Sequence, residues 1–298
     1  MLLANAVFFD SPTPFKTWGC PVLAFPQISS FLYCTLSTWI RGSKINCFNK
    51  DAASTMAAYP TATEPSVSWT PRRNGMTGLR RGTGRVFPTR FTPPSSTIKP
   101  TELFPGQATY GLLTRYIHRH DPRKVLLFTD GSCLKNGQLN PQAGWGVVHG
   151  PGFAGQPPLV VSGPLESVGP FGGPGVQTSN RAELRAVIAA LGLWNWLDEG
   201  FNTVVIATDS EYVVAGATEW AKIWIQNGWR RAANEQVMNK DLWEALLGEV
   251  ERWHDYGVSI QFWKIPRDWN EVADAAAKEA AEEHEALYGW MEVRGLSH

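Results

Sequence analysis

The chain has 298 residues, of which 43% are hydrophobic and 18% are charged, so it can form a core and is not a disordered polyelectrolyte. Its four cysteines form no Cys-x-x-Cys pair, which argues against a zinc ribbon or a disulfide scaffold and favours a reducing compartment. The formal net charge is zero, yet residues 1–104 carry 11 Lys and Arg against 4 Asp and Glu, whereas residues 105–298 carry 16 against 23. This asymmetry predicts a basic tail joined to an acidic domain.

The first fifty residues are apolar and aromatic, without helical or strand periodicity. No charged residue stands between Thr17 and Ile40, a length that raises the question of a membrane span. Pro21 and Pro26 interrupt this run, and only Lys16 flanks it on the N-terminal side. No cationic segment precedes the apolar residues as in a secretory signal peptide, so we expect neither a span nor such a signal.

Residues 56–105 are rich in Ser, Thr, Pro and Arg, and their only acids are Glu64 and Glu102. Such a composition cannot bury a core and predicts disorder. Two interpretations stay open, an unstructured linker and an organelle transit peptide whose translation starts at Met56. The protein is therefore expected inside the cell, with the nucleus and the mitochondrion both open.

Strand and helix patterns begin near Gln107 and predict a folded domain over residues 106–298, preceded by a disordered basic extension over residues 1–105. Apolar β-branched runs predict five strands, at residues 125–129, 144–148, 159–162, 203–208 and 258–263. Periodic or alanine-rich segments predict four helices, at about residues 181–197, 210–227, 239–254 and 268–285. This order predicts an α/β fold of three layers, with a five-stranded mixed sheet flanked by helices.

Three acids stand at the ends of predicted elements. Asp130 follows the first strand, Asp209 follows the fourth, and Glu183 lies in the first turn of the first long helix. Ligand sites in α/β sheets gather at the carboxyl ends of strands, where neighbouring carboxylates raise each other's pKa. Divalent cations neutralise such a cluster, and oxygen ligands of this kind suit Mg²⁺ or Mn²⁺.

Each of these acids also has a purely structural interpretation. Asp130 precedes Gly131 in a turn dipeptide, and Asp209 can cap the next helix. Glu183 can complete a capping box with Asn180.

Asp274 has no such role, because Asp268 and Glu271 form a capping box of their own at the start of the last helix. Asp is a poor helix former within the alanine-rich run that surrounds Asp274. We therefore count it as a fourth candidate.

Four short blocks contain these acids: Leu-Phe-Thr-Asp-Gly-Ser, Thr-Ser-Asn-Arg-Ala-Glu-Leu, Ala-Thr-Asp-Ser-Glu-Tyr and Asn-Glu-Val-Ala-Asp. They resemble the signature blocks of the type 1 ribonuclease H family, and they occur in that family's order within residues 124–285. Residues 224–231 and 239–243 also resemble substrate-gripping segments of that family. The resemblance implies an RNase H-like fold.

The resemblance further implies an activity, the endonucleolytic cleavage of the RNA strand of RNA–DNA hybrids, which leaves 3′-hydroxyl and 5′-phosphate ends. Two divalent ions, Mg²⁺ or in its place Mn²⁺, would be held by Asp130, Glu183, Asp209 and Asp274. One ion lowers the pKa of the attacking water, and the other stabilises the leaving 3′ oxygen.

Contacts to the RNA strand are implied for Asn136, Ser179 and Asn180, which match positions that touch 2′-hydroxyl groups. The 2′-hydroxyl is the group that distinguishes RNA from DNA. The implied partner is thus an RNA–DNA hybrid, bound by a monomer with no obligate protein partner and no membrane.

Contacts to the DNA strand are implied for four residues. Tyr212 and Trp220 match aromatic residues of a DNA-strand channel, and Thr178 and Asn239 match members of a phosphate pocket. The family usually has an arginine in this pocket where the present chain has Val176, so a weaker grip on the DNA strand is expected.

A basic and aromatic patch, formed by Trp229, Arg230 and Arg231, supplies local positive charge in an otherwise acidic domain. Without the resemblance, Trp220 and Trp229 are equally well interpreted as core aromatics at helical spacing.

The loop at residues 264–269 is short and lacks the mobile histidine that the family usually carries there. This absence favours an alternative function, a catalytically weak nucleic-acid binding protein, whereas the complete set of four acids favours an active enzyme. A retroelement-derived RNase H domain is a third alternative.

Overall fold

The computed structural model describes residues 68–70, 78–109, 113–153, 155–232, 234–283 and 287–294. The apolar run between Thr17 and Ile40 and the proposed start at Met56 lie outside these residues. Within the described ranges, no helix is both long and apolar enough to cross a membrane.

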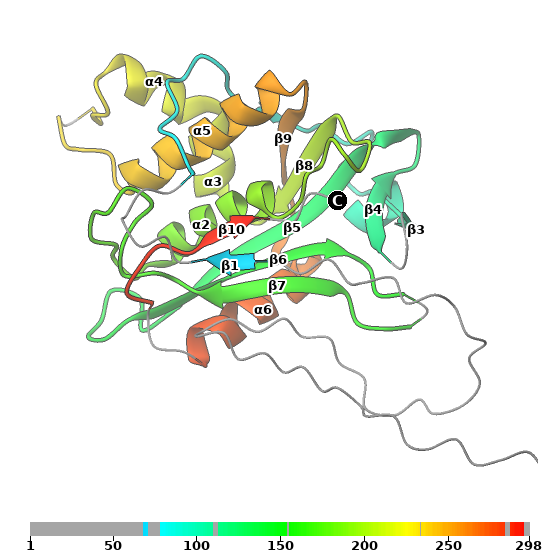
Figure 1. Cartoon of the computed structure of the whole chain (residues 1–298), viewed down its shortest axis with the longest axis horizontal. Helices are drawn as coiled ribbons and strands as arrows, with labels where there is room; N and C mark the ends of the chain where they lie inside the picture. Colours follow the sequence, from blue (N-terminus) through cyan, green and yellow to red (C-terminus); the bar gives the residue numbers. More distant parts are fainter. Residues whose placement is uncertain are drawn as a thin grey trace, which may run out of the picture. The chain divides into compact units, whose positions relative to one another are not determined.

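An eight-stranded mixed sheet forms the centre of the described domain (Figure 1). The strand order is β2-β9-β8-β5-β4-β3, while β6 pairs with β5 and β7 pairs with β6. The strands are β2 (Thr89–Arg90), β3 (Gly106–Ala108), β4 (Thr114–His118), β5 (Asp121–Leu134), β6 (Gln142–Gly150), β7 (Leu159–Pro164), β8 (Thr203–Thr208) and β9 (Ser259–Lys264). All five predicted strands are present, and the α/β fold with a mixed sheet is confirmed, but β2, β3 and β4 were not predicted.

The three central strands β5, β8 and β9 are parallel, and β6 and β7 are antiparallel to their neighbours. Every residue of β8 is buried, as expected for a parallel strand covered on both faces. Alternate residues of β5 enter two different cores, with Leu127 on one face and Leu126 on the other. This alternation is what makes the domain three layers thick.

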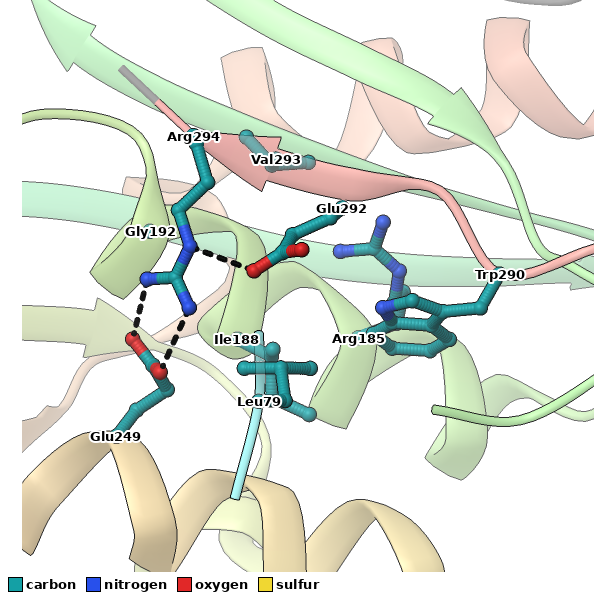
Figure 2. Close-up of a pocket in the computed structure, with 9 residues that line it drawn as sticks. All are labelled: Leu79, Arg185, Ile188, Gly192, Glu249, Trp290, Glu292, Val293 and Arg294. Carbon is teal, nitrogen blue, oxygen red and sulfur yellow. Dashed lines mark hydrogen bonds and ion pairs between the residues drawn. The ribbon is translucent and has the colours of Figure 1, made fainter. Parts of the chain in front are cut away.

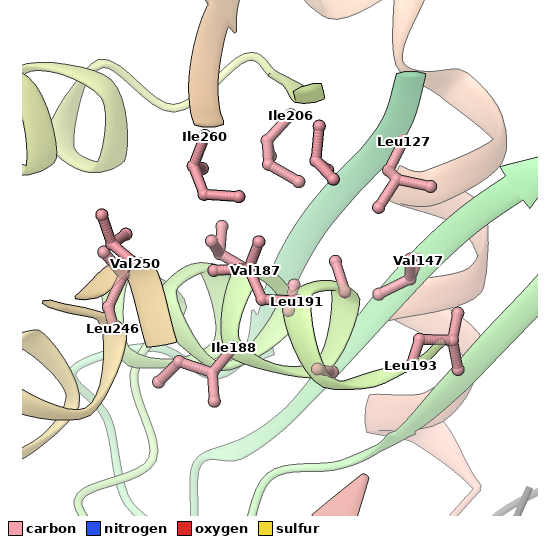
Figure 3. Close-up of a cluster of buried hydrophobic side chains, with 14 of the residues drawn as sticks. Leu127, Val147, Val187, Ile188, Leu191, Leu193, Ile206, Leu246, Val250 and Ile260 are labelled. Carbon is pink, nitrogen blue, oxygen red and sulfur yellow. The ribbon is translucent and has the colours of Figure 1, made fainter. Parts of the chain in front are cut away.

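Helices cover both faces of the sheet (Figure 1). Helices α2 (Ser179–Gly192) and α5 (Lys240–Asp255) lie on one face, and α6 (Glu271–Glu282) lies on the other. Figure 3 shows the larger core, in which Val187 and Leu191 of α2 and Leu246 of α5 meet Leu127 and Ile206 of the sheet.

The predicted helix at residues 210–227 is present but irregular. It consists of α3 (Glu211–Ala215), a π-helical turn η1 (Gly216–Trp220) and α4 (Ala221–Gln226), and we call residues 211–226 the handle helix. A Cβ at Gly216 would collide with the indole of Trp243, so the glycine lets this helix approach α5 closely. A π turn inside a helix often marks a functional site.

The predicted disorder of residues 1–105 is wrong for residues 78–105. Here α1 (Pro100–Leu103) brings Leu103 and Phe104 into the second core, where they are 2% and 0% exposed. The buried Glu251 carboxylate of α5 accepts hydrogen bonds from the amides of Thr83 and Gly84, both at 2.7 Å. The composition rule failed because a short polar segment needs no core of its own when it packs on an existing surface. The remainder of the predicted extension falls mainly on residues outside the described ranges.

The C-terminal strand β10 (Glu292–Arg294) pairs with β1 (Ser68–Thr70) as a second, two-stranded sheet. Beside it, Arg294 lies between Glu249 and Glu292, and the guanidinium of Arg185 lies 4.3 Å from the ring centre of Trp290 (Figure 2). These side chains enclose a cavity of about 10 Å³, which has room for about one water molecule. The cavity is therefore a packing feature and is too small for a ligand.

Candidate active site

Asp130 lies within β5, four residues before the strand ends, and not at its end as predicted. The pairing of β5 with β8 stops at Phe128, whereas its pairing with β6 continues to Leu134. Asp130 thus lies just beyond the end of its parallel neighbour β8. This is the carboxyl-end side of the parallel strands, where ligand sites of α/β sheets gather. The side chain is buried, with 5% of the residue exposed.

Gly131 explains how Glu183 reaches Asp130. A Cβ at residue 131 would collide with the backbone nitrogen of Glu183, so only glycine lets α2 pack this closely on β5. Glu183 is the fifth residue of α2, and Thr178 caps that helix by accepting from the amide of Arg181. The predicted capping box of Glu183 with Asn180 is therefore wrong, because the helix begins earlier than the pattern suggested.

Asp209 directly follows β8 and is free of the capping role that the sequence left open. The cap of α3 is Ser210, whose hydroxyl accepts from the amide of Val213 and donates to Glu183 at 2.5 Å. Asp209 accepts a hydrogen bond of 2.8 Å from the side-chain amide of Asn270. Ser210 and Asn270 thus fix the orientation of two candidate ligands.

Asp274 lies in the first turn of α6, which packs closely on β6. A Cβ at Gly146 would come within 2.9 Å of the carbonyl oxygen of Ala273, so the glycine permits this approach. No side chain caps α6, and the predicted capping box of Asp268 with Glu271 is wrong because residues 267–269 form a 3₁₀ turn, η2 (Arg267–Trp269).

Two cations contact the Asp274 carboxylate. Arg267 donates to it at 2.6 Å and lies 3.7 Å from Asp209, and Lys278 forms a second ion pair with it. The loop without a histidine therefore places a guanidinium beside the acids.

Burial and mutual repulsion perturb the acids strongly. Burial raises the pKa of Asp130 to about 8, with further increases from the charges of Asp209, Asp274 and Glu183. Burial also raises the pKa of Glu183 to about 7, although the hydrogen bond from Ser210 opposes that shift. The charges of the other three acids thus act on Asp130 in the same direction as its burial.

The donor set fits a divalent cation. All four side chains offer carboxylate oxygens, which are the donors that Mg²⁺ and Mn²⁺ prefer, and an added positive charge would relieve the repulsion that raises both pKa values. Within the described ranges, no three carboxylate, imidazole or thiol side chains are already gathered around one point. Arg267 and Lys278 both form ion pairs with Asp274.

The residues matched to RNA contacts lie near the C-terminal end of β5 and the start of α2. Asn136 is exposed just beyond β5, and Ser179 and Asn180 begin α2. The thiol of Cys133 lies 3.5 Å from the carbonyl of Gln177, so the end of β5 and the start of α2 meet here.

The residues matched to DNA contacts form a second group. The hydroxyl of Tyr212 accepts a hydrogen bond from the side-chain amide of Asn239 at 3.3 Å. The ring centres of Tyr212 and Trp220 lie 6.4 Å apart. Arg181 binds Asp241 through two hydrogen bonds and so joins the first turns of α2 and α5, where Thr178 and Asn239 lie.

Exposure separates the ambiguous side chains. Trp220 is 36% exposed, whereas Trp229 is partly buried against the main core at a left-handed φ of 63°. Arg230 and Arg231 are exposed, and Arg231 pairs with Glu235. Val176 is 64% exposed in place of the pocket arginine.

Sequence reasoning gave no role to three residues that the structure places at the acids: Ser210, Asn270 and Arg267. Ser210 had a signal, because Ser is among the best N-cap residues and directly precedes the handle helix. Asn270 is the first residue of the block Asn-Glu-Val-Ala-Asp, but sequence reasoning assigned it no role of its own. Arg267 had none, because only the turn of η2 directs its side chain to Asp209 and Asp274.

Comparison with known proteins decides the family. A family model described as RNase H matches residues 122–282, slightly more than half of the chain. The chain belongs to the RNase H family. This confirms the resemblance drawn from the four blocks, and the matched residues include all four acids of the candidate site.

Individual relatives agree with this assignment. Human Ribonuclease H1 is 36% identical over 165 residues, which cover 54% of this chain and 51% of the human protein. Ribonuclease H of Alcanivorax borkumensis is 35% identical over 164 residues, 54% of this chain and 93% of that protein. The chain thus spans about half the length of the human RNase H protein it matches and nearly all of the bacterial one.

Among solved structures, LC9-RNase H1, described as a type 1 RNase H with the type 2 active-site motif, is 28% identical with a TM-score of 0.39. That similarity covers 59% of this chain and 78% of the solved chain.

Proposed function

We propose that this chain is an endoribonuclease that cleaves the RNA strand of RNA–DNA hybrids and leaves 3′-hydroxyl and 5′-phosphate ends. The family assignment and the named relatives support a hybrid ribonuclease. The observation that carries the proposal is the placement of the four acids: Ser210 joins Glu183 to the turn after β8, and Arg267 pairs with both Asp209 and Asp274. Burial and the three other acids raise the pKa of Asp130 to about 8.

The protein groups have distinct roles in this proposal. Two Mg²⁺ ions, when bound, would supply Lewis acids for the attacking water and for the leaving 3′ oxygen. Asp130, Glu183, Asp209 and Asp274 would hold them. Ser210 orients Glu183 and Asn270 orients Asp209, so these ligands need little rearrangement when the site is loaded.

Substrate selection would come from the two groups of residues beside the acids. Asn136 lies just beyond β5, and Ser179 and Asn180 begin α2, so their polar side chains are available to hydrogen-bond a 2′-hydroxyl. The Tyr212–Trp220 pair offers aromatic surface for the other strand, with Asn239 bound to the tyrosine hydroxyl.

Cleavage of an end-labelled RNA–DNA hybrid by the full chain tests the proposal. We expect cutting that requires Mg²⁺ or Mn²⁺ and spares single-stranded RNA and duplex DNA. Asp130→Asn should lower the rate by several orders of magnitude, because metal ligands act as a unit.

Asp121→Asn is the matched control, since Asp121 begins the same strand and pairs with Arg123 and Lys124. Equal rates for wild type and Asp130→Asn would refute the site, and equal cleavage of single-stranded RNA would refute the hybrid specificity.

A second candidate function, a catalytically weak binding protein, is favoured by one observation. Arg267 donates to Asp274 at 2.6 Å, and so occupies a carboxylate that cleavage would require as a ligand. Tight hybrid binding without metal-dependent cleavage would select this alternative.

A further inference from the structure

Residues 78–91, which we call the strap, lie against the handle helix. The ring of Phe87 faces the ammonium of Lys222 at 5.4 Å, and a Cβ at Gly84 would collide with the side chain of Ile225. At its end the strap forms β2, which pairs in parallel with β9 at the edge of the sheet. The strap therefore connects the handle helix to the catalytic sheet.

Arg90 makes the most specific of these contacts. Its Nε donates to Glu219 at 2.9 Å and its terminal nitrogen donates to Glu211 at 3.0 Å. These two acids stand eight residues apart, Glu211 at the start of α3 and Glu219 within the π turn, and each directly precedes an expected DNA-strand aromatic, Tyr212 or Trp220. One guanidinium thus spans the same length of helix as the aromatic pair.

Stability alone gives little reason for this bridge. The side chains of Glu211 and Glu219 are 57% and 55% exposed, and exposed ion pairs contribute little to folding. Their charges matter more to a polyanion, because two carboxylates next to the aromatic pair would repel DNA phosphates within the screening distance of about 10 Å. The surrounding domain, with 16 basic against 23 acidic residues over 105–298, offers little compensation.

We propose that Arg90 is a positioning residue for the hybrid. It neutralises Glu211 and Glu219 beside the aromatic pair, so that Tyr212 and Trp220 can receive the DNA strand. This inference rests on the proposed function, since it concerns the same hybrid.

The test measures binding of a fluorescent RNA–DNA hybrid to the full chain carrying Asp130→Asn, which prevents cleavage. In that background, Arg90→Gln should raise the Kd about threefold to tenfold at low salt, and the difference should shrink as added salt screens the acids. A triple variant that adds Glu211→Gln and Glu219→Gln should return the Kd to within about twofold of the parent, because no charge is left to neutralise.

Arg80→Gln is the matched control, because Arg80 is a strap arginine whose ion pair, at 2.9 Å, is with Asp255 at the end of α5 and not with the handle helix. Its Kd should equal that of the parent. In the otherwise wild-type chain, Arg90→Gln should raise KM for the hybrid far more than it lowers kcat.

An unchanged Kd for Arg90→Gln would overturn the inference. A triple variant as weak as Arg90→Gln would also overturn it, because Arg90 would then act by direct contact and not by neutralisation. If the Asp130→Asn parent binds no hybrid at all, the proposed function itself fails, an outcome distinct from both.

Discussion

A single carboxyl group, that of Asp130, links the stability of this protein to its site. The folded protein raises the pKa of this group from 3.8 to about 8, so between these values the unfolded chain is ionised while the folded one keeps its proton. Stability in the absence of metal therefore falls as the pH rises from about 4, and the loss is complete once the folded pKa near 8 is passed.

We predict that Asp130→Asn stabilises the metal-free protein at pH 8. The amide cannot ionise, so the variant avoids the penalty, and one pKa unit corresponds to about 1.4 kcal/mol before relaxation of the site reduces it. We expect a gain of about 1–3 kcal/mol, measured by urea unfolding in EDTA at pH 5 and pH 8.

The gain should be small at pH 5 and should be cancelled by Mg²⁺, which stabilises only the wild type. A variant that is less stable than wild type at pH 8 would contradict the assignment of a strained, ionisable group at this position.

Arg267 is the second residue that decides how the site behaves. Its guanidinium contacts Asp274 at 2.6 Å and must be displaced, at least in part, when a cation binds there. We predict that Arg267→Gln lowers the dissociation constant for Mg²⁺ about threefold to tenfold, a change of up to about 1.4 kcal/mol, as measured by calorimetry without nucleic acid.

Arg123→Gln serves as the control, since Arg123 pairs only loosely with Asp121 at 3.7 Å and is well exposed. Weaker Mg²⁺ binding by Arg267→Gln would show instead that the guanidinium supports the ligands and does not compete with the ion.

At the scale of elements, the strap and α1 are integral parts of the domain. They supply Leu103 and the adjoining Phe104 to the second core and three backbone amides to the buried Glu251. Without them the second core loses two large apolar side chains and Glu251 loses its hydrogen bonds to the strap, and both losses are costly.

We predict that a chain beginning at Gly78 unfolds cooperatively, and that a chain beginning at Gln107 is less stable by at least about 5 kcal/mol. The two chains are compared by urea unfolding followed by circular dichroism. Equal free energies of unfolding would show that residues 78–106 add nothing to the stability of the fold.

Over the whole described domain, basic residues of the strap form ion pairs with acidic residues that follow them in the sequence. Strap arginines each pair with acids of the domain, in the pairs Arg80–Asp255, Arg81–Glu244, Arg85–Glu251, Arg85–Asp255, Arg90–Glu211 and Arg90–Glu219. The basic segment thus neutralises part of the acidic domain to which it is joined. A domain meant to approach nucleic acid gains from this, because the net charge decides whether the polyanion is attracted or repelled.

The sequence by itself determined the α/β class, the five principal strands, the four long helices and the four acids. These features depend on local patterns: apolar runs for buried parallel strands, 3.6-residue periodicity for helices, and short blocks that keep each acid at a fixed place in its element. Asp130 was expected at a strand end and lies inside β5, yet it still lies just beyond the end of its parallel neighbour β8, because β8 ends where it was expected to.

Only the tertiary structure decided the rest. The strap has the composition of a disordered segment, and its order comes from hydrogen bonds that Thr83 donates to Glu251 and from ion pairs with α5. These partners lie more than 160 residues away in the chain. The contact of Arg267 with Asp274, the caps at Thr178 and Ser210, and the bridge from Arg90 likewise depend on where distant backbones meet. Local sequence patterns do not encode such meetings, because they depend on how separate elements pack together.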